Sequence, residues 1–141
     1  MAKFVELESG NFFNVSSIEE ISPHVRIKSN SERIKVIASV HIIGADGCVR
    51  ELISGAGEVP WPNEDEDPRH DAEIYETLCR ERKKLEEFTC SFFADIVHKM
   101  CLDLKICYLS PGIQKQLQLA AQDAAKRIAE AVPKNEEEQN E

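Results

Sequence analysis

The opening part of the chain, residues 3–54, carries the short alternations of apolar and polar side chains that are typical of a β-sheet. The strongest run is residues 34–43 (IKVIASVHII), in which β-branched residues dominate and both faces look apolar. We expect this run to be the central strand. Residues 44–47 (GADG) supply glycines that tolerate positive φ, so residues 48–53 should return as the partner strand of a hairpin.

Two later segments show the three- or four-residue spacing of amphipathic helices. The first starts at Asp67-Pro68, where aspartate can cap a helix and proline fits its first turn, and is predicted over residues 68–104, a length of about 55 Å. The second starts at Ser110-Pro111 and is predicted over residues 111–131. Residues 55–67 hold two prolines, two glycines and an acidic run, and are expected to form an irregular linker.

Together these elements predict an α+β fold, a small antiparallel sheet followed by two amphipathic helices. A chain of 141 residues is the usual size of one domain, so residues 1–133 should form a single unit, whereas the polar tail 134–141 cannot bury enough surface to order itself. The first helix is longer than a small sheet can cover. We therefore expect half of it to pack on a second copy, giving a homodimer or higher homo-oligomer; the alternative is a bent helix lying wholly over its own sheet.

The net charge of -9 disfavours binding to nucleic acid, which needs clustered lysine and arginine. Residues 64–67 and four glutamates of the tail hold eight of the 26 acidic residues, so a local site for a small anionic ligand is still compatible with this charge. No signal peptide and no apolar run long enough for a membrane span is present, and a cytoplasmic protein is expected. The five cysteines form no CxxC pair and are expected to be reduced and buried.

Catalytic and metal-binding signatures are not evident in the sequence. The four histidines are scattered, no GxSxG elbow occurs, and Gly55-Ala56-Gly57 is a lone GxG that we interpret as a flexible strand exit. His70 and Glu73 near the acidic run 64–67 could hold a metal, but a solvated acidic loop is the favoured interpretation. His98 and Cys101 are expected to lie in the core. We therefore predict no enzyme activity, no metal site and no cofactor.

The best candidate binding site combines Trp61 with Arg69 and Arg80. An indole can stack on an aromatic ligand, and guanidinium groups can pair with a phosphate or a carboxylate. The alternative is a tryptophan that plugs the open end of the sheet. The basic stretch at residues 80–84 is interleaved with glutamates, including Glu81, and is expected to form i to i+4 ion pairs on a solvated face.

The opening pattern Leu7-x-x-Gly10-x-x-x-Asn14-x-x-x-Ile18-x-x-Ile21 resembles the start of many small bacterial and phage proteins, in which a hairpin leads into a short edge segment. The resemblance covers about 15 residues and implies no activity. A small sheet followed by two helices is also similar in layout to phage proteins that block bacterial defence, including oligomeric sponges that sequester nucleotide signals. This second resemblance rests on architecture, without a matched binding motif.

These observations lead to a functional hypothesis. We expect a non-enzymatic, self-associating binding protein of bacterial or phage origin that acts by occupying a partner protein or a small anionic, nucleotide-like ligand. One alternative is an acidic mimic of nucleic acid, in which residues 65–67 and the glutamate tail cover a basic protein surface. A second alternative is a small hydrolase with an unrecognised site.

Overall fold

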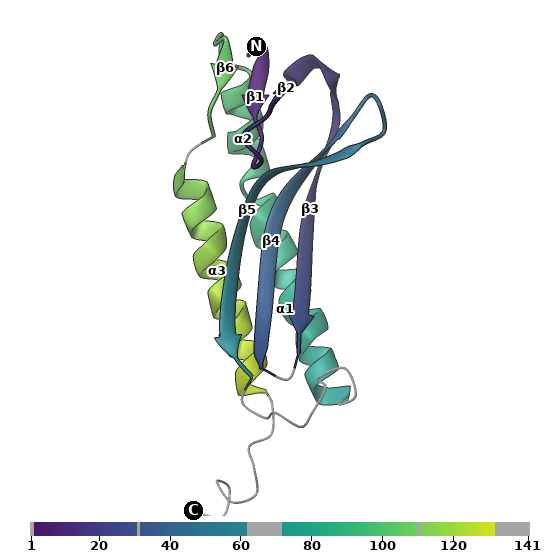
Figure 1. Cartoon of the computed structure of the whole chain (residues 1–141), viewed down its shortest axis with the longest axis vertical. Helices are drawn as coiled ribbons and strands as arrows, with labels where there is room; N and C mark the ends of the chain where they lie inside the picture. The colour runs from purple at the N-terminus through teal and green to yellow at the C-terminus, as the bar shows by residue number, and fades with distance from the viewer. Residues whose placement is uncertain (1, 31, 62–71, 110, 132–141) are drawn as a thin grey trace, which may run out of the picture.

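The structure is a computed structural model that describes residues 2–30, 32–61, 72–109 and 111–131. It has the predicted α+β fold, with a long antiparallel sheet followed by helices (Figure 1). In chain order the elements are β1 (Phe4–Glu6), β2 (Phe12–Asn14), the 3-10 turn η1 (Val15–Ser17), β3 (Ile18–Ser29), β4 (Arg33–Gly44), β5 (Val49–Pro60), α1 (Ala72–Cys90), α2 (Phe93–Met100), β6 (Ile106–Cys107) and α3 (Pro111–Glu130).

The main sheet has the order β3-β4-β5, and both neighbouring pairs are antiparallel. The prediction that β4 is central is confirmed, and so is the hairpin after it, where Gly47 adopts a φ of +77°. Pro23 lies in the outer strand β3 opposite Val40, a position that tolerates the missing N–H of proline because one edge of β3 has no neighbour among the described strands.

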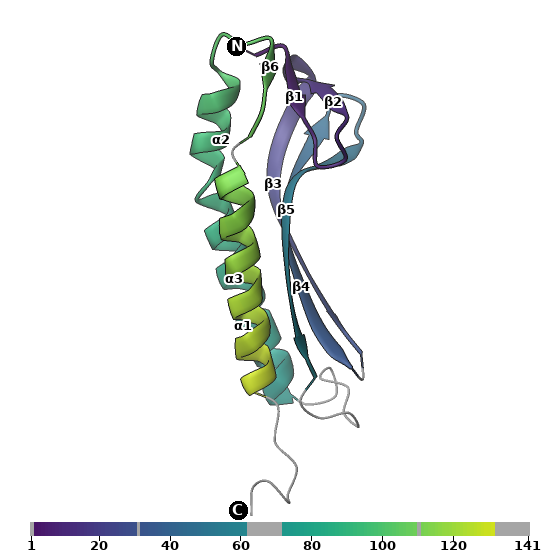
Figure 2. The ribbon, with the colours of Figure 1, turned by 60° about the vertical axis from the view of Figure 1, so that its left-hand side comes forward.

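Helices cover one face of the main sheet. Figure 2 shows α1 and α3 side by side on this face, while the strands curve away from them at both ends and leave the opposite face open. The alternate side chains of β4 explain the arrangement, since those that face the helices are apolar and fully buried: Ile34, Val36, Ala38, Val40 and Ile42. The core therefore lies between the helices and the sheet.

A second, smaller sheet has the order β2-β1-β6 and lies at one end of the molecule (Figure 1). Strands β1 and β2 are antiparallel and are joined by a turn in which Gly10 has a φ of +89°. The short strand β6 pairs in parallel with β1 and was not predicted from the sequence. Backbone hydrogen bonds from Ala2 to Met100 and from Lys3 to Leu104 join β1 to the end of α2, so the N-terminal residues and the segment after α2 form one unit.

Residues 55–60 belong to β5, and the prediction of a linker beginning at residue 55 is wrong. The glycines have a packing role. A Cβ atom on Gly55 would lie 2.4 Å from the backbone nitrogen of Gln118, and one on Gly57 would lie 2.2 Å from that of Gln122. The backbone of α3 thus rests directly on these two glycines. The interpretation of Gly55-Ala56-Gly57 as a flexible exit from the strand is therefore wrong. Residues 62–67 of the expected linker lie outside the described residues.

The predicted long helix is broken. Helix α1 ends at Cys90, α2 runs from Phe93 to Met100, and residues 101–104 are not helical. Thr89 Oγ1, just before the break, donates to the Leu85 carbonyl (2.7 Å), and Ser91 Oγ, inside it, donates to the Phe88 carbonyl (2.5 Å). Such bonds from side chains to helix carbonyls favour bending. Helices α1 and α2 thus form a bent pair instead of one long helix, and residues 68–71 of the predicted helix lie outside the described ranges. The homo-oligomer expected from the long helix stays a prediction. Helix α3 agrees with its prediction.

Two expectations about individual side chains are also wrong. Of the five cysteines, Cys107 is buried, while Cys48, Cys79, Cys90 and Cys101 are exposed. Glu81 is 2% exposed and is not part of a solvated face. Its carboxylate pairs with Arg127 of α3 and lies 3.6 Å from Lys84 Nζ, so it joins the two helices.

Candidate functional site

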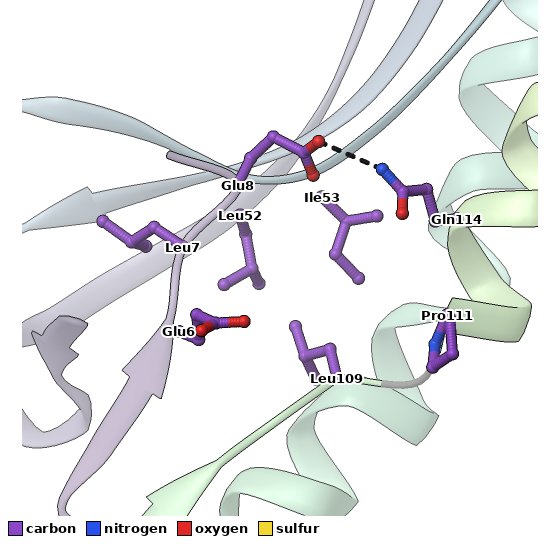
Figure 3. A pocket seen from close by; sticks show the side chains of 8 residues that line it. All are labelled: Glu6, Leu7, Glu8, Leu52, Ile53, Leu109, Pro111 and Gln114. Carbon is purple, nitrogen blue, oxygen red and sulfur yellow. Dashed lines mark hydrogen bonds between the residues drawn. The ribbon is translucent and has the colours of Figure 1, made fainter. Parts of the chain in front are cut away.

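A cavity of about 350 Å³ opens between the small sheet, β5 and the start of α3 (Figure 3). Its apolar wall comes from segments that are far apart in the sequence: Leu7, Leu52, Ile53, Leu109 and Pro111. Its polar side chains are Glu6, Glu8 and Gln114. Leu7, Leu52 and Ile53 are buried parts of the core, which makes this wall a firm surface.

Hydrogen bonds fix two of the three polar side chains. Gln114 Nε2 donates to Glu8 Oε1 (3.0 Å, dashed in Figure 3) and to the Ser54 carbonyl (3.1 Å). Glu8 Oε2 accepts from the Ser54 N–H at 3.2 Å. Both amide hydrogens of Gln114 are therefore in use, and Glu8 is held between α3 and β5.

Glu6 and the amide oxygen of Gln114 have no hydrogen-bond partner among the described residues. Figure 3 shows the Glu6 carboxylate pointing across the cavity toward Leu109. Since the donors of Gln114 are occupied and carboxylates only accept when ionised, the lining side chains offer a ligand acceptors alone. Two carboxylates also give the cavity a negative charge. The arrangement suits a ligand that carries positive charge and N–H donors beside a small apolar body.

A second cavity, of about 310 Å³, lies between α2 and the first turn of α3 and has a different character. His98 and Lys99 contribute basic groups, Asp95 an acidic one, and Phe92 and Ile113 an apolar floor. The expectation that His98 and Cys101 lie in the core is wrong, because both are exposed. Both cavities adjoin the first turn of α3, whose backbone N–H groups favour anions, but of the two only this one also has basic side chains.

The open face of the main sheet brings together two histidines that looked scattered in the sequence. The rings of His24 and His41 stack with centroids 4.5 Å apart and planes 23° apart. Ser39 Oγ donates to Glu51 Oε2 (3.2 Å), and His41 Nε2 lies 3.8 Å from the same oxygen. Burial, followed by the neighbouring His24, lowers the pKa of His41.

The hydrogen bonds among Ser39, His41 and Glu51 do not connect these residues in the sequence that a nucleophilic triad needs. A serine nucleophile needs a hydrogen bond to the imidazole that takes its proton. Here Ser39 donates to the carboxylate of Glu51 instead, and Ser39 is fully buried. The hydrolase alternative stays a prediction, since its site was not specified by residue.

The predicted Trp61 site is described only in part. Trp61 directly follows β5, is 4% exposed and donates its backbone N–H to the Glu32 carbonyl (2.7 Å). Its indole Nε1 is buried without a partner in the part of the chain that the structure describes. Arg80 is exposed on α1, and Arg69 lies outside the described residues. The burial of Trp61 suits a plug at the end of the sheet better than an open stacking surface, and the three-residue site stays a prediction.

Sequence reasoning missed the cavity of Figure 3 because its parts come from residues 6–8, 52–53 and 109–114, which share no motif. Within the described ranges no group of three His, Cys, Asp or Glu side chains could hold a metal ion; His70 and residues 64–67 lie outside these ranges. None of the helices described is long and apolar enough to span a membrane. Comparison with protein-family models, curated proteins and solved structures finds no match to this chain.

Proposed function

We propose that this protein is a binding protein that sequesters a small cationic ligand in the cavity lined by Glu6, Glu8 and Gln114. The ligand class is a protonated amine or a guanidinium joined to a small apolar body. The observation that supports the proposal is the chemistry of the lining: every side-chain hydrogen-bonding atom left without a partner there is an acceptor, next to an apolar wall.

Each polar residue has a distinct part in this proposal. Glu6 would form the charge-assisted hydrogen bond to the ligand cation, since its carboxylate has no other partner among the described residues. Glu8 and Gln114 are positioning residues, because their mutual hydrogen bond and their contacts with Ser54 hold the mouth of the cavity between β5 and α3. The leucines and Ile53 would contact the apolar body.

Three aromatic probes of nearly equal size test the charge preference: phenethylamine, 2-phenylethanol and phenylacetate, measured by isothermal titration calorimetry. The cation should bind most tightly, the alcohol more weakly and the anion not at all. Glu6→Gln should weaken the binding of the amine at least tenfold, because it removes a charge-assisted hydrogen bond worth roughly 1.5–3 kcal/mol, and should leave the binding of the alcohol nearly unchanged. Glu20→Gln, an exposed change on β3, is the matched control.

Equal binding of the three probes would contradict the proposal. An anionic ligand, as expected from the sequence, has a different candidate position in the cavity of His98 and Lys99. Phenylacetate binding that is lost in Lys99→Gln and kept in Glu6→Gln would favour that position. The nucleic-acid mimic depends on residues 64–67 and 134–141, which lie outside the described residues, and it stays a prediction together with a role against bacterial defence.

A further inference from the structure

The solvent-facing side of α3 carries an apolar residue between two opposite charges. Leu119 is 58% exposed. Lys115 precedes it by four residues and Asp123 follows it by four, and both are exposed. Residues four apart lie on the same face of a helix, so the three side chains form one row. We call Lys115, Leu119 and Asp123 the α3 row.

The charges of the α3 row are available for a partner. Neither Lys115 nor Asp123 forms an ion pair within the part of the chain that the structure describes. By contrast, the neighbouring Arg127 is engaged with the buried Glu81. A lysine and an aspartate without partners on either side of an exposed leucine have no role in the stability of this domain that the structure shows.

A hollow of about 260 Å³ lies beside the α3 row, between α1 and α3. Its apolar side chains are Leu85, Phe88 and Ala120, of which Phe88 is 38% exposed, and its charged ones are Glu81, Lys84, Asp123 and Arg127. Asp123 is the member of the α3 row that lines it. The hollow gives side chains of a second helix room to enter, as the interdigitation of packed helices requires.

We propose that the α3 rows of two copies of this chain pack antiparallel about a twofold axis at Leu119. Rotation about this axis places Leu119 against its counterpart, and it places Lys115 of each copy against Asp123 of the other. The row reverses its charge about its midpoint, which is the pattern that a twofold contact requires of one self-complementary surface. This symmetry favours a second copy over an unrelated partner, which would not need it.

Charge reversal tests this contact directly, with the molar mass measured by analytical ultracentrifugation over 1–100 µM protein. The wild type should be a dimer at the upper end of this range. Lys115→Asp and Asp123→Lys should each raise the dimer dissociation constant at least tenfold, because like charges then face each other across the axis. A 1:1 mixture of the two variants should form a heterodimer, since every facing pair is again of opposite charge.

Controls separate the interface from the fold. Circular dichroism should show unchanged melting for both variants, because the residues are exposed, and Glu20→Lys on β3 should leave the dimer intact. A monomeric wild type at 100 µM would overturn the proposal. So would dimers that persist in both single variants, or variants that stay monomeric when mixed. The contact is independent of the cavity of Glu6, so failure of one proposal leaves the other standing.

Discussion

The side-chain amide of Gln122 on α3 forms two hydrogen bonds with the backbone of Glu58 on β5. Its Nε2 donates to the Glu58 carbonyl (3.0 Å), and its Oε1 accepts from the Glu58 N–H (2.8 Å). These are the two groups that an additional strand would use, so Gln122 occupies the hydrogen-bonding position of a strand neighbour. About two turns earlier in the helix, Gln114 Nε2 donates to the Ser54 carbonyl (3.1 Å) in a similar way.

Replacement of Gln122 by alanine should therefore destabilise the domain. Two hydrogen bonds are lost, each worth about 0.5–1.5 kcal/mol, so we expect the free energy of unfolding, measured in urea, to fall by about 1–3 kcal/mol. Gln116→Ala is the matched control, because Gln116 is an exposed glutamine of the same helix. Equal losses in the two variants would show that the bonds to Glu58 are not the cause.

Gly57→Ala should also destabilise the domain, through a steric effect. The added Cβ would lie 2.3 Å from Gln122 Cα and 2.6 Å from the Ala121 carbonyl carbon, so α3 has to move away from β5. Overpacking of this kind costs roughly 1–3 kcal/mol and should appear as a lower melting temperature. Ala56→Val is the control: Ala56 is exposed on the open face of the sheet, so this change should alter the melting temperature little. Unchanged melting in Gly57→Ala would contradict the close contact of α3 with β5.

The stacked histidines predict a loss of stability in mild acid. Burial, then His24, lowers the pKa of His41, so the unfolded chain binds more protons than the native state as the pH falls below the ordinary histidine value of 6.5. The contribution of His41 to the free energy of unfolding is therefore fully present above pH 6.5. It is lost as the pH falls from 6.5 toward the lowered pKa of His41. Urea unfolding at pH 7 and pH 5.5 should show this decrease, and His41→Gln should reduce it.

His98→Gln serves as the control for this experiment, since it removes an exposed histidine outside the pair. It should keep the wild-type difference between the two pH values. If His41→Gln retains the full difference as well, other groups cause the pH dependence.

The elements that could be predicted from the sequence are those with local causes. Strand β4 and its hairpin follow from β-branched residues before a turn that needs glycine, and α3 follows from Pro111 and its apolar spacing. The glycines at 55 and 57 were misinterpreted because their cause is tertiary: they make room for the α3 backbone, which a pattern confined to β5 does not reveal.

The residues of the candidate site could not be predicted from sequence patterns either, because tertiary contacts bring them together. Glu81 looks like its charged neighbours in sequence, and only the approach of α3 buries it against Arg127. The cavity of Glu6 and Gln114 joins side chains more than 100 residues apart. The stacking of His24 on His41 could have been predicted in part, because the alternation of each strand places both residues on the open face. That prediction also needs the register of β3 against β4, which the sequence alone does not give.

Both outer edges of the main sheet carry features that oppose strand pairing. The side chains of Gln114 and Gln122 on α3 form hydrogen bonds with backbone groups of β5 that an additional strand would need. In β3, Pro23 has no backbone N–H to donate to such a strand. Fibril growth proceeds by the addition of strands to such edges. Both edges are thereby poor templates for the addition of strands, and the twofold contact proposed at the α3 row would close on itself as a dimer instead of growing.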